Sequence, residues 1–291
     1  MKLPRVVVLT SSLLVFAAVS TVHTEDKTVV NGPVEHIYAA PGGVQLKAYV
    51  FSGQKAGAGK RRPAIVLFHG GGWAMGEPQW AFPRAKVFAE RGMVAVAAQY
   101  RLSDQKKITP LEAMADARAV IRWMRKHADS LGVDPDHIAA YGWSAGAHLA
   151  ASAAIFDQRE SGETMSAVPN ALVLISPAVS LASDNWVQRL LGQRGDPRDI
   201  SPDEHVREGL PPTLILEGSD DIVTPLSGVK RFCERLRAAS NTCELHVYQG
   251  FGHLFTPKGT PDDGMPKPDP ATAADAAARA ERFLKSLGFL R

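Results

Sequence analysis

Short apolar runs alternate with amphipathic segments along most of the chain. Residues 64–68, 93–98 and 171–175 are continuous apolar runs, which is the pattern of strands covered on both faces. Within residues 110–128, apolar side chains recur at the three- and four-residue spacing of an amphipathic helix. Strands that alternate with helices predict an α/β fold, a mostly parallel twisted sheet with helices on both faces.

The same reading extends to the remaining segments. A Pro-Gly-Gly turn at residues 41–43 separates the first two expected strands, and residues 178–209 form the only sizeable insertion between late strands. The expected strands are residues 34–40, 46–51, 64–68, 93–98, 138–141, 171–175, 213–217 and 244–248. The expected helices are residues 80–91, 110–128, 145–156, 229–238 and 271–287. No internal repeat or linker divides this series, so we expect one domain.

The first segment has the pattern of a targeting signal. Residues 1–20 contain two basic side chains, then an apolar run over residues 6–19, and end in the small-x-small pattern Ala-Val-Ser. This predicts a signal peptide cleaved near Ser20 or Thr24, an exported protein and a mature catalytic domain at residues 25–291. The apolar run is shorter than a membrane span of ~20 residues, so no stable membrane insertion is expected after cleavage. An uncleaved anchor is the alternative.

Composition adds little to this picture beyond exclusions. With 45% hydrophobic and 22% charged residues among 291, the chain has an ordinary globular make-up. The net charge is +3; without Lys2 and Arg5 of the leader, 31 basic residues face 30 acidic ones, a net of +1. Such a balance predicts no nucleic-acid partner.

Export permits a disulfide between Cys233 and Cys243, which we favour over two buried free thiols.

The sharpest chemical motif is Gly142-Trp143-Ser144-Ala145-Gly146, between an expected strand and an expected helix. Glycines at 142 and 146 allow a sharp turn that exposes Ser144, and the following helix N-terminus favours a developing oxyanion. A structural turn with a capping serine is the alternative. The strand–turn–helix setting favours a nucleophile.

A second motif, His69-Gly70-Gly71-Gly72-Trp73, directly follows the apolar strand at residues 64–68. Its glycines allow backbone N–H groups to approach a substrate, as the second half of an oxyanion hole requires. A phosphate cradle is less consistent, because no G-x-x-x-x-G-K-[ST] or G-x-G-x-x-G pattern accompanies the motif. We expect His69 to order this loop rather than to act in catalysis.

Two later strands end in an acidic pair and in a histidine between glycines. Asp220 and Asp221 follow the strand at 213–217, and His253 follows the strand at 244–248. A serine hydroxyl becomes a nucleophile when a histidine accepts its proton, and a carboxylate must orient that histidine. The order serine, acid, histidine therefore predicts a Ser-His-Asp triad, with either aspartate as the acid. No H-E-x-x-H or C-x-x-C pattern supports a metal site.

These motifs together resemble the esterase and lipase branch of the α/β-hydrolase superfamily that carries a His-Gly-Gly-Gly motif. The similarity covers about residues 38–287 and lies near hormone-sensitive lipase and the feruloyl and acetyl-xylan esterases. It implies Ser144 as nucleophile, His253 as general base and then acid, and, because relatives commonly show Gly-x-x-Asp, Asp221 as the orienting acid. It further implies no cofactor and three oxyanion-hole amides: Ala145, Gly71 and Gly72.

The chain departs from larger relatives in having no room for a long helical cap before the glycine-rich motif. We therefore expect a minimal cap and a shallow, open cleft, walled in part by Trp73, Trp143, Trp186, Leu190 and Leu191. Such a cleft suits short acyl groups on small-molecule or polysaccharide-linked esters, including acetyl-xylan or feruloyl esters, rather than long-chain triglycerides. The alternatives are a serine peptidase of the prolyl-oligopeptidase type and a non-catalytic α/β-hydrolase-fold binding module.

Overall fold

The computed structural model describes residues 30–53, 61–104, 107–157, 163–261 and 264–291. The expected signal peptide and its cleavage sites at Ser20 and Thr24 lie outside these residues. Within them, no helix combines the length and apolar character that crossing a membrane requires.

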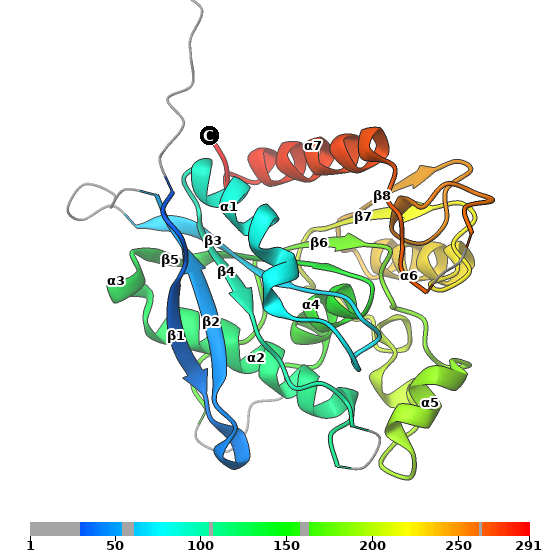
Figure 1. Cartoon of the computed structure of the whole chain (residues 1–291), viewed down its shortest axis with the longest axis horizontal. Helices are drawn as coiled ribbons and strands as arrows, with labels where there is room; N and C mark the ends of the chain where they lie inside the picture. Colours follow the sequence, from blue (N-terminus) through cyan, green and yellow to red (C-terminus); the bar gives the residue numbers. More distant parts are fainter. Residues whose placement is uncertain (1–29, 54–60, 105–106, 158–162, 262–263) are drawn as a thin grey trace, which may run out of the picture.

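The eight strands of the described residues form a single sheet, in the order β1-β2-β4-β3-β5-β6-β7-β8 (Figure 1). The strands are β1 Val34–Ala39, β2 Leu46–Phe51, β3 Arg62–Phe68, β4 Val94–Ala98, β5 Val133–Trp143, β6 Ala171–Ile175, β7 Thr213–Gly218 and β8 Cys243–Tyr248. β1 pairs with β2 and β2 with β4 in antiparallel fashion, and the strands from β4 to β8 are parallel neighbours. The predicted mostly parallel sheet is confirmed.

Helices cover both faces of the sheet (Figure 1). Residues from α1 and α7 belong to one buried cluster, and residues from α2, α4 and α6 belong to the other. The helices are α1 Phe82–Glu90, α2 Pro110–Lys126, α3 Ala128–Leu131, α4 Ala145–Ile155, α5 Asn185–Leu191, α6 Leu226–Ala238 and α7 Pro270–Ser286. Short 3-10 turns are η1 Pro41–Gly43, η2 Pro78–Ala81, η3 Pro197–Ile200, η4 Pro202–Glu204 and η5 His253–Phe255.

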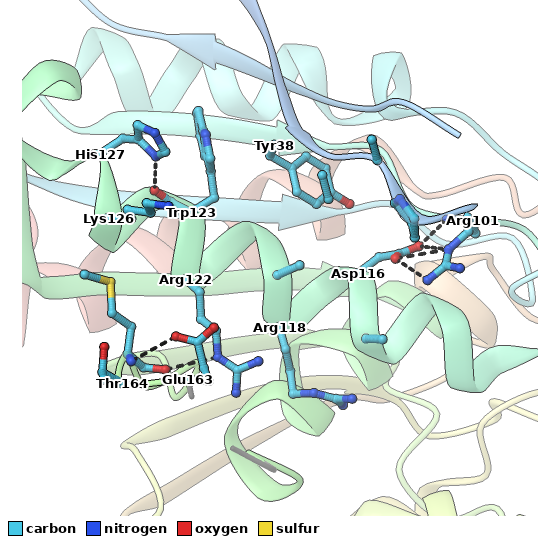
Figure 2. A pocket seen from close by; sticks show the side chains of 16 residues that line it. Tyr38, Arg101, Asp116, Arg118, Arg122, Trp123, Lys126, His127, Glu163 and Thr164 are labelled. Carbon is cyan, nitrogen blue, oxygen red and sulfur yellow. Dashed lines mark hydrogen bonds and ion pairs between the residues drawn. The ribbon is translucent and has the colours of Figure 1, made fainter. Parts of the chain in front are cut away.

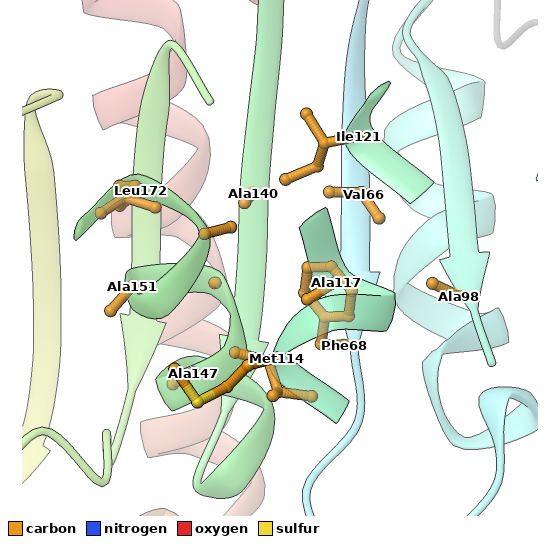
Figure 3. Packing of buried hydrophobic residues seen from close by; sticks show 14 of the residues in the cluster. Val66, Phe68, Ala98, Met114, Ala117, Ile121, Ala140, Ala147, Ala151 and Leu172 are labelled. Atoms are coloured by element: carbon orange, nitrogen blue, oxygen red, sulfur yellow. The ribbon is translucent and has the colours of Figure 1, made fainter. Parts of the chain in front are cut away.

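The continuous apolar runs form strands that are covered on both faces, as expected. In β3, Ile65 and Leu67 pack on the α1 and α7 side, whereas Val66 and Phe68 pack on the other side, and all four are fully buried. Figure 3 shows Val66 near Ile121 and Phe68 near Ala117, two α2 residues of the same buried cluster. Side chains that alternate across a strand must all be apolar when helices cover both faces.

Local chemistry explains where two helices begin and end. The hydroxyl of Thr109 accepts the N–H of Leu111, while Glu112 accepts the N–H of Thr109, so a capping box starts α2. The helix predicted over residues 110–128 divides at His127, where α2 ends and the single turn of α3 follows.

The parallel strands β3, β5, β7 and β8 end along one edge of the sheet, and the candidate residues lie in the loops that follow these ends.

Candidate active site

Ser144 stands in a sharp turn between β5 and α4. Its φ of 54° and ψ of −124° lie in a region that residues with a side chain rarely adopt. The flanking glycines make this turn possible. A Cβ at Gly142 would lie 2.2 Å from the carbonyl oxygen of Gly146, and a Cβ at Gly146 would lie 2.2 Å from that of Phe68. The motif therefore folds as predicted and places Ser144 just beyond the end of β5.

The loops after β7 and β8 bring the acid and the histidine to this serine. His253 Nε2 lies 3.0 Å from Ser144 Oγ, and His253 Nδ1 lies 2.8 Å from Asp221 Oδ2. When Nδ1–H donates to Asp221, the lone pair of Nε2 is left to accept the hydroxyl proton of Ser144. Because β7 and β8 are parallel neighbours, both loops leave the same edge of the sheet. The structure thus brings the three predicted residues into one hydrogen-bonded chain.

Asp221 is held as a buried anion. Its Oδ1 accepts the backbone N–H groups of Val223 and Thr224, each at 2.8 Å, and its Oδ2 accepts the Thr224 hydroxyl at 2.9 Å. Burial by itself raises the pKa of Asp221. The hydrogen bond and charge of His253, with the Thr224 amide, outweigh that effect and hold the pKa below its ordinary value. The site therefore keeps this carboxyl ionised opposite His253.

Asp220, the other candidate acid, faces a different partner. One of its oxygens pairs with Lys258 Nζ at 2.8 Å, and the other accepts the hydroxyl of Ser219 at 2.8 Å. Its side chain is one-third exposed, whereas that of Asp221 is fully buried. The geometry therefore assigns the contact with His253 to Asp221.

The glycine-rich loop after β3 presents free backbone amides. Gly71 has φ 115°, and a Cβ there would lie 2.1 Å from the carbonyl oxygen of Met75, so only glycine fits. Within the part of the chain that the structure describes, no acceptor takes the amide hydrogens of Gly71, Gly72 or Ala145. Ala145 is the first residue of α4, where the helix dipole adds partial positive charge. Such amides can stabilise an oxyanion that forms on a substrate.

Comparison with known proteins places this geometry in a family. Residues 53–173 match the BD-FAE family. The probable carboxylic ester hydrolase LipM of Mycobacterium tuberculosis is 28% identical over 244 residues, which cover 76% of this chain and 54% of LipM. Endo-1,4-beta-xylanase B of Butyrivibrio fibrisolvens is 26% identical over 212 residues, which cover 68% of this chain and 32% of the xylanase. The chain spans about half the length of the first curated relatives it matches.

Solved structures give a more complete match. The apo form of Thermogutta terrifontis esterase 2 is 36% identical, with a TM-score of 0.79 over 89% of this chain and 96% of that esterase. The chain belongs to the α/β-hydrolase esterase family. Structures of the same esterase with propionate or butyrate bound match with a TM-score of 0.77, at 36% and 35% identity and over 96% and 95% of that protein.

In this esterase-family chain, His69 orders the glycine-rich loop. Its Nδ1 lies 2.7 Å from the carbonyl oxygen of Gly70, and its ring stacks on Tyr100 at 4.3 Å. The Tyr100 hydroxyl donates to the His69 carbonyl at 2.9 Å. Burial lowers the pKa of His69 to about 4, so the ring is neutral at ordinary pH. The expectation of a loop-ordering role is confirmed by these contacts.

Trp73 does not line an open cleft as expected. Its side chain is buried, and its indole N–H donates to His148 Nδ1 at 3.3 Å. On the other side of the same ring, His148 Nε2 lies 2.8 Å from the carbonyl oxygen of Ile200 in η3. Burial lowers the pKa of His148 to about 4, which suits a neutral ring that accepts from Trp73 and donates to Ile200. Trp73 therefore ties the loop to α4 and the insertion.

The insertion contributes one exposed ring and two core residues. Trp186 of α5 is 36% exposed, and its indole N–H donates to the carbonyl oxygen of Gly72 at 3.0 Å. Leu190 and Leu191 are buried in the core cluster, so they do not line a cleft as expected. Trp143, next to Ser144, is partly buried. Of the expected wall residues, Trp186 and Trp143 alone keep an accessible surface.

Three residues that sequence reasoning did not select complete the site. Thr224 bonds Asp221, and Ser176 accepts the backbone N–H of Leu254, the residue after the histidine, at 3.1 Å. Glu217, at the end of β7, accepts the Ser176 hydroxyl at 3.4 Å. The sequence did contain a signal for Glu217: a single carboxyl group stands near the end of an otherwise uncharged strand segment.

A cavity of about 930 Å³ lies elsewhere, between β1, α2 and residues 163–165 (Figure 2). None of the triad residues lines it. Two of the arginines that line it pair with carboxylates: Arg101 donates in a fork to Asp116, and Arg122 donates to Asp157 at 2.8 Å. These pairs hold the loop after β4 and the end of α4 on α2, which is a structural role.

Cys233 of α6 and Cys243 of β8 form a disulfide, as favoured from the sequence. The bridge fixes α6 against the start of β8, the end opposite the histidine loop. Within the described ranges, no group of three or more His, Cys, Asp or Glu side chains could hold a metal ion.

Proposed function

We propose that this protein is an exported serine carboxylesterase that hydrolyses short-chain acyl esters, including esters carried on polysaccharides. The observation that carries the proposal is the chain of contacts from Ser144 Oγ through His253 to Asp221, together with backbone amides at Ala145 and the glycine-rich loop that donate to no acceptor among the described residues. This arrangement meets the geometric needs of acyl transfer: an activated nucleophile, an oriented base and donors for an oxyanion.

In the first half of the reaction, Ser144 Oγ attacks the ester carbonyl carbon while its proton passes to His253 Nε2. The carbonyl oxygen becomes an oxyanion within reach of the free amides, and the Asp221 carboxylate stabilises the imidazolium. The tetrahedral intermediate then collapses. The bond to the alcohol oxygen breaks, and His253 Nε2 returns its proton to the departing alcohol, which leaves an acyl-enzyme on Ser144.

In the second half, water replaces the alcohol. His253 Nε2 removes a proton from water as its oxygen attacks the acyl carbon, and a second oxyanion forms at the same amides. Collapse breaks the bond to Ser144 Oγ, which recovers its proton from His253. The products are one carboxylic acid and one alcohol, and no cofactor enters the balance.

Two comparisons support the substrate class. Thermogutta terrifontis esterase 2, which matches over nearly its full length, has been solved with propionate and with butyrate bound. The similarity to xylanase B, a protein named for its action on a polysaccharide, supports ester groups carried on such polymers. In this chain the short insertion between β6 and β7 carries a single α-helix, α5, which leaves little structure to enclose a long acyl tail.

The leader and the disulfide support export. Disulfides persist mainly in oxidising compartments such as the periplasm and the extracellular medium. The Cys233–Cys243 bridge therefore fits the signal peptide proposed at residues 1–20. We test this by expressing the full chain and sequencing the N-terminus of the exported protein. A mature N-terminus near residue 21 or 25 supports export, and an intact Met1 in the cell interior contradicts it.

The activity is tested with p-nitrophenyl esters of graded chain length, together with acetylated xylan and feruloyl methyl ester. We expect the highest kcat/KM between acetyl and butyryl esters. Ser144→Ala should lower kcat by about 10³-fold or more without changing the melting temperature by more than a few degrees. Preference for palmitoyl over butyryl esters would contradict the substrate class, and undiminished turnover by Ser144→Ala would contradict the mechanism.

A further inference from the structure

Glu217 is a buried carboxyl group near the end of β7, four residues before Asp221. It is fully buried in β7, where its Oε1 accepts the backbone N–H of Gly218 at 2.8 Å and the Ser176 hydroxyl at 3.4 Å. No N–H or O–H group of the described residues donates to its Oε2. A buried carboxylate oxygen without a donor is costly, whereas a protonated oxygen would itself be a donor in need of an acceptor.

Asp221 offers that acceptor. The negative charge of Asp221 acts on Glu217, and a hydrogen bond between two carboxyl groups requires a proton on one of them. Asp221 receives the donors that suit an anion, from Val223, Thr224 and His253, whereas Glu217 receives only Gly218 and Ser176. Burial, reinforced by the negative charge of Asp221, raises the pKa of Glu217 well above its ordinary value. The single negative charge of the pair therefore resides on Asp221.

Through Ser176, Glu217 also connects the loop that carries Asp221 with the loop that carries His253. Ser176, whose hydroxyl donates to Glu217, accepts the Leu254 N–H beside the histidine. The Thr224 hydroxyl, which donates to Asp221 at 2.9 Å, also lies 3.2 Å from the carbonyl oxygen of Ser176. The ionisable groups that face Glu217 across these contacts are Asp221 and, beyond it, His253.

We propose that Glu217 is a positioning residue: a neutral carboxylic acid whose Oε2–H donates to Asp221 and holds that carboxylate against His253. The inference rests on the proposed function, because it assigns the group that orients the acid of the same triad. Glu217 exchanges no proton with the substrate. Its contribution is to supply a donor without adding a second negative charge next to Asp221.

Two substitutions separate the effect of the Glu217 hydrogen-bond donor from the effect of its side-chain volume. Glu217→Gln keeps an acceptor oxygen for Gly218 and Ser176 and offers an N–H to Asp221. Glu217→Leu keeps much of the volume and loses the donor. We expect Glu217→Gln to retain kcat within about threefold. Glu217→Leu should lose about 10- to 100-fold in kcat with KM within about threefold, the scale of one hydrogen bond to a charged group. Asp220→Asn, at a partly exposed carboxyl on the same loop, is the matched control.

The protonation state has a readout that does not depend on catalysis. Below the ordinary glutamate pKa of 4.5, Glu217 is neutral in both the folded and the unfolded chain. Above that pH the unfolded chain is stabilised by ionisation and the folded protein is not, so the free energy of unfolding falls until the raised folded pKa is reached. Glutamine does not titrate. The melting temperature of Glu217→Gln minus that of the wild type should therefore increase as pH rises from 4 to 8.

The outcomes distinguish this inference from the proposed function. A wild type without esterase activity contradicts the proposed function, while the melting series still tests the neutral Glu217. An active wild type whose kcat survives in Glu217→Leu, or falls equally in Glu217→Gln and Glu217→Leu, overturns the positioning role. A melting-temperature difference that stays constant with pH contradicts the claim that Glu217 is protonated and neutral in the folded protein. If circular dichroism shows that Glu217→Leu does not fold, the test rests on Glu217→Gln. Its kcat must then stay within about threefold of the wild type, and its melting-temperature difference must increase with pH.

Discussion

The indole N–H of Trp186 donates a hydrogen bond to the carbonyl oxygen of Gly72 at 3.0 Å, which joins residues 114 positions apart. One partner lies on α5 of the insertion, and the other is an expected oxyanion-hole residue. The guanidinium of Arg189 lies over the same indole, 5.4 Å from the ring centroid. Trp186 thereby links the small cap to the loop that would contact the acyl group, and it is the best candidate for setting acyl specificity.

If Trp186 walls the acyl site, its removal should relax chain-length preference. We expect Trp186→Ala to raise the ratio of kcat/KM for octanoyl over butyryl esters by about three- to tenfold, the scale of burying about one methylene group. Trp186→Phe, which keeps the ring and loses the N–H donor, should destabilise the protein by at most about 1 kcal/mol. Arg189→Gln is the control for the cation–π contact. An unchanged chain-length profile in Trp186→Ala would remove Trp186 from the acyl site.

The two neighbouring aspartates should respond very differently to loss of charge. Asp221→Asn breaks the contact that holds the His253 tautomer, so kcat should fall by about 10⁴-fold. Asp220→Asn loses one exposed pair with Lys258, and kcat should stay within about twofold. Steady-state kinetics on p-nitrophenyl butyrate checks both. The reverse ranking would transfer the orienting role to Asp220.

The sharp turn at Ser144 should not tolerate a single methyl group at Gly146. A Cβ there would lie 2.2 Å from the Phe68 carbonyl oxygen and 2.3 Å from that of His69, and backbone atoms cannot move aside cheaply. We expect Gly146→Ala to lower the free energy of unfolding by about 3 kcal/mol, measured by urea titration. Gly195→Ala, whose Cβ would meet only Leu191 at 3.9 Å, should change it by at most about 0.5 kcal/mol. Equal stabilities would mean that the turn can open.

The disulfide should matter for stability and not for turnover. Cys233 and Cys243 close a loop with a sequence separation of 10, for which the chain-entropy account gives about 3 kcal/mol. The double variant Cys233→Ala/Cys243→Ala should therefore unfold at lower urea with kcat nearly unchanged, because the bridge lies at the start of β8 and His253 lies past its end. Mass measurement with and without reductant confirms the bridge in the wild type. A large loss of kcat in a folded double variant would show that the bridge reaches the site.

Local sequence determined most of the framework. Fully apolar runs such as β3 predict strands covered on both faces, because alternate side chains must each find a helix to pack on. The glycines around Ser144 predict a sharp turn, because a Cβ at either position meets backbone atoms. Those constraints act over a few residues, so they can be recognised without knowledge of the rest of the chain.

The tertiary structure decided what depends on side-chain direction and on distant packing. Asp220 and Asp221 follow the same strand at adjacent positions, and only the folded loop turns one toward Lys258 and the other toward His253. Trp73 looked like a cleft wall because it follows the glycine-rich loop, but contact with His148 draws it into the core. Glu217 stands near Asp221 only because the strand end and the following loop fold together. Spacing along the chain identifies which groups are present, whereas packing between distant segments sets where each one points and how much water surrounds it, which in turn decides its charge.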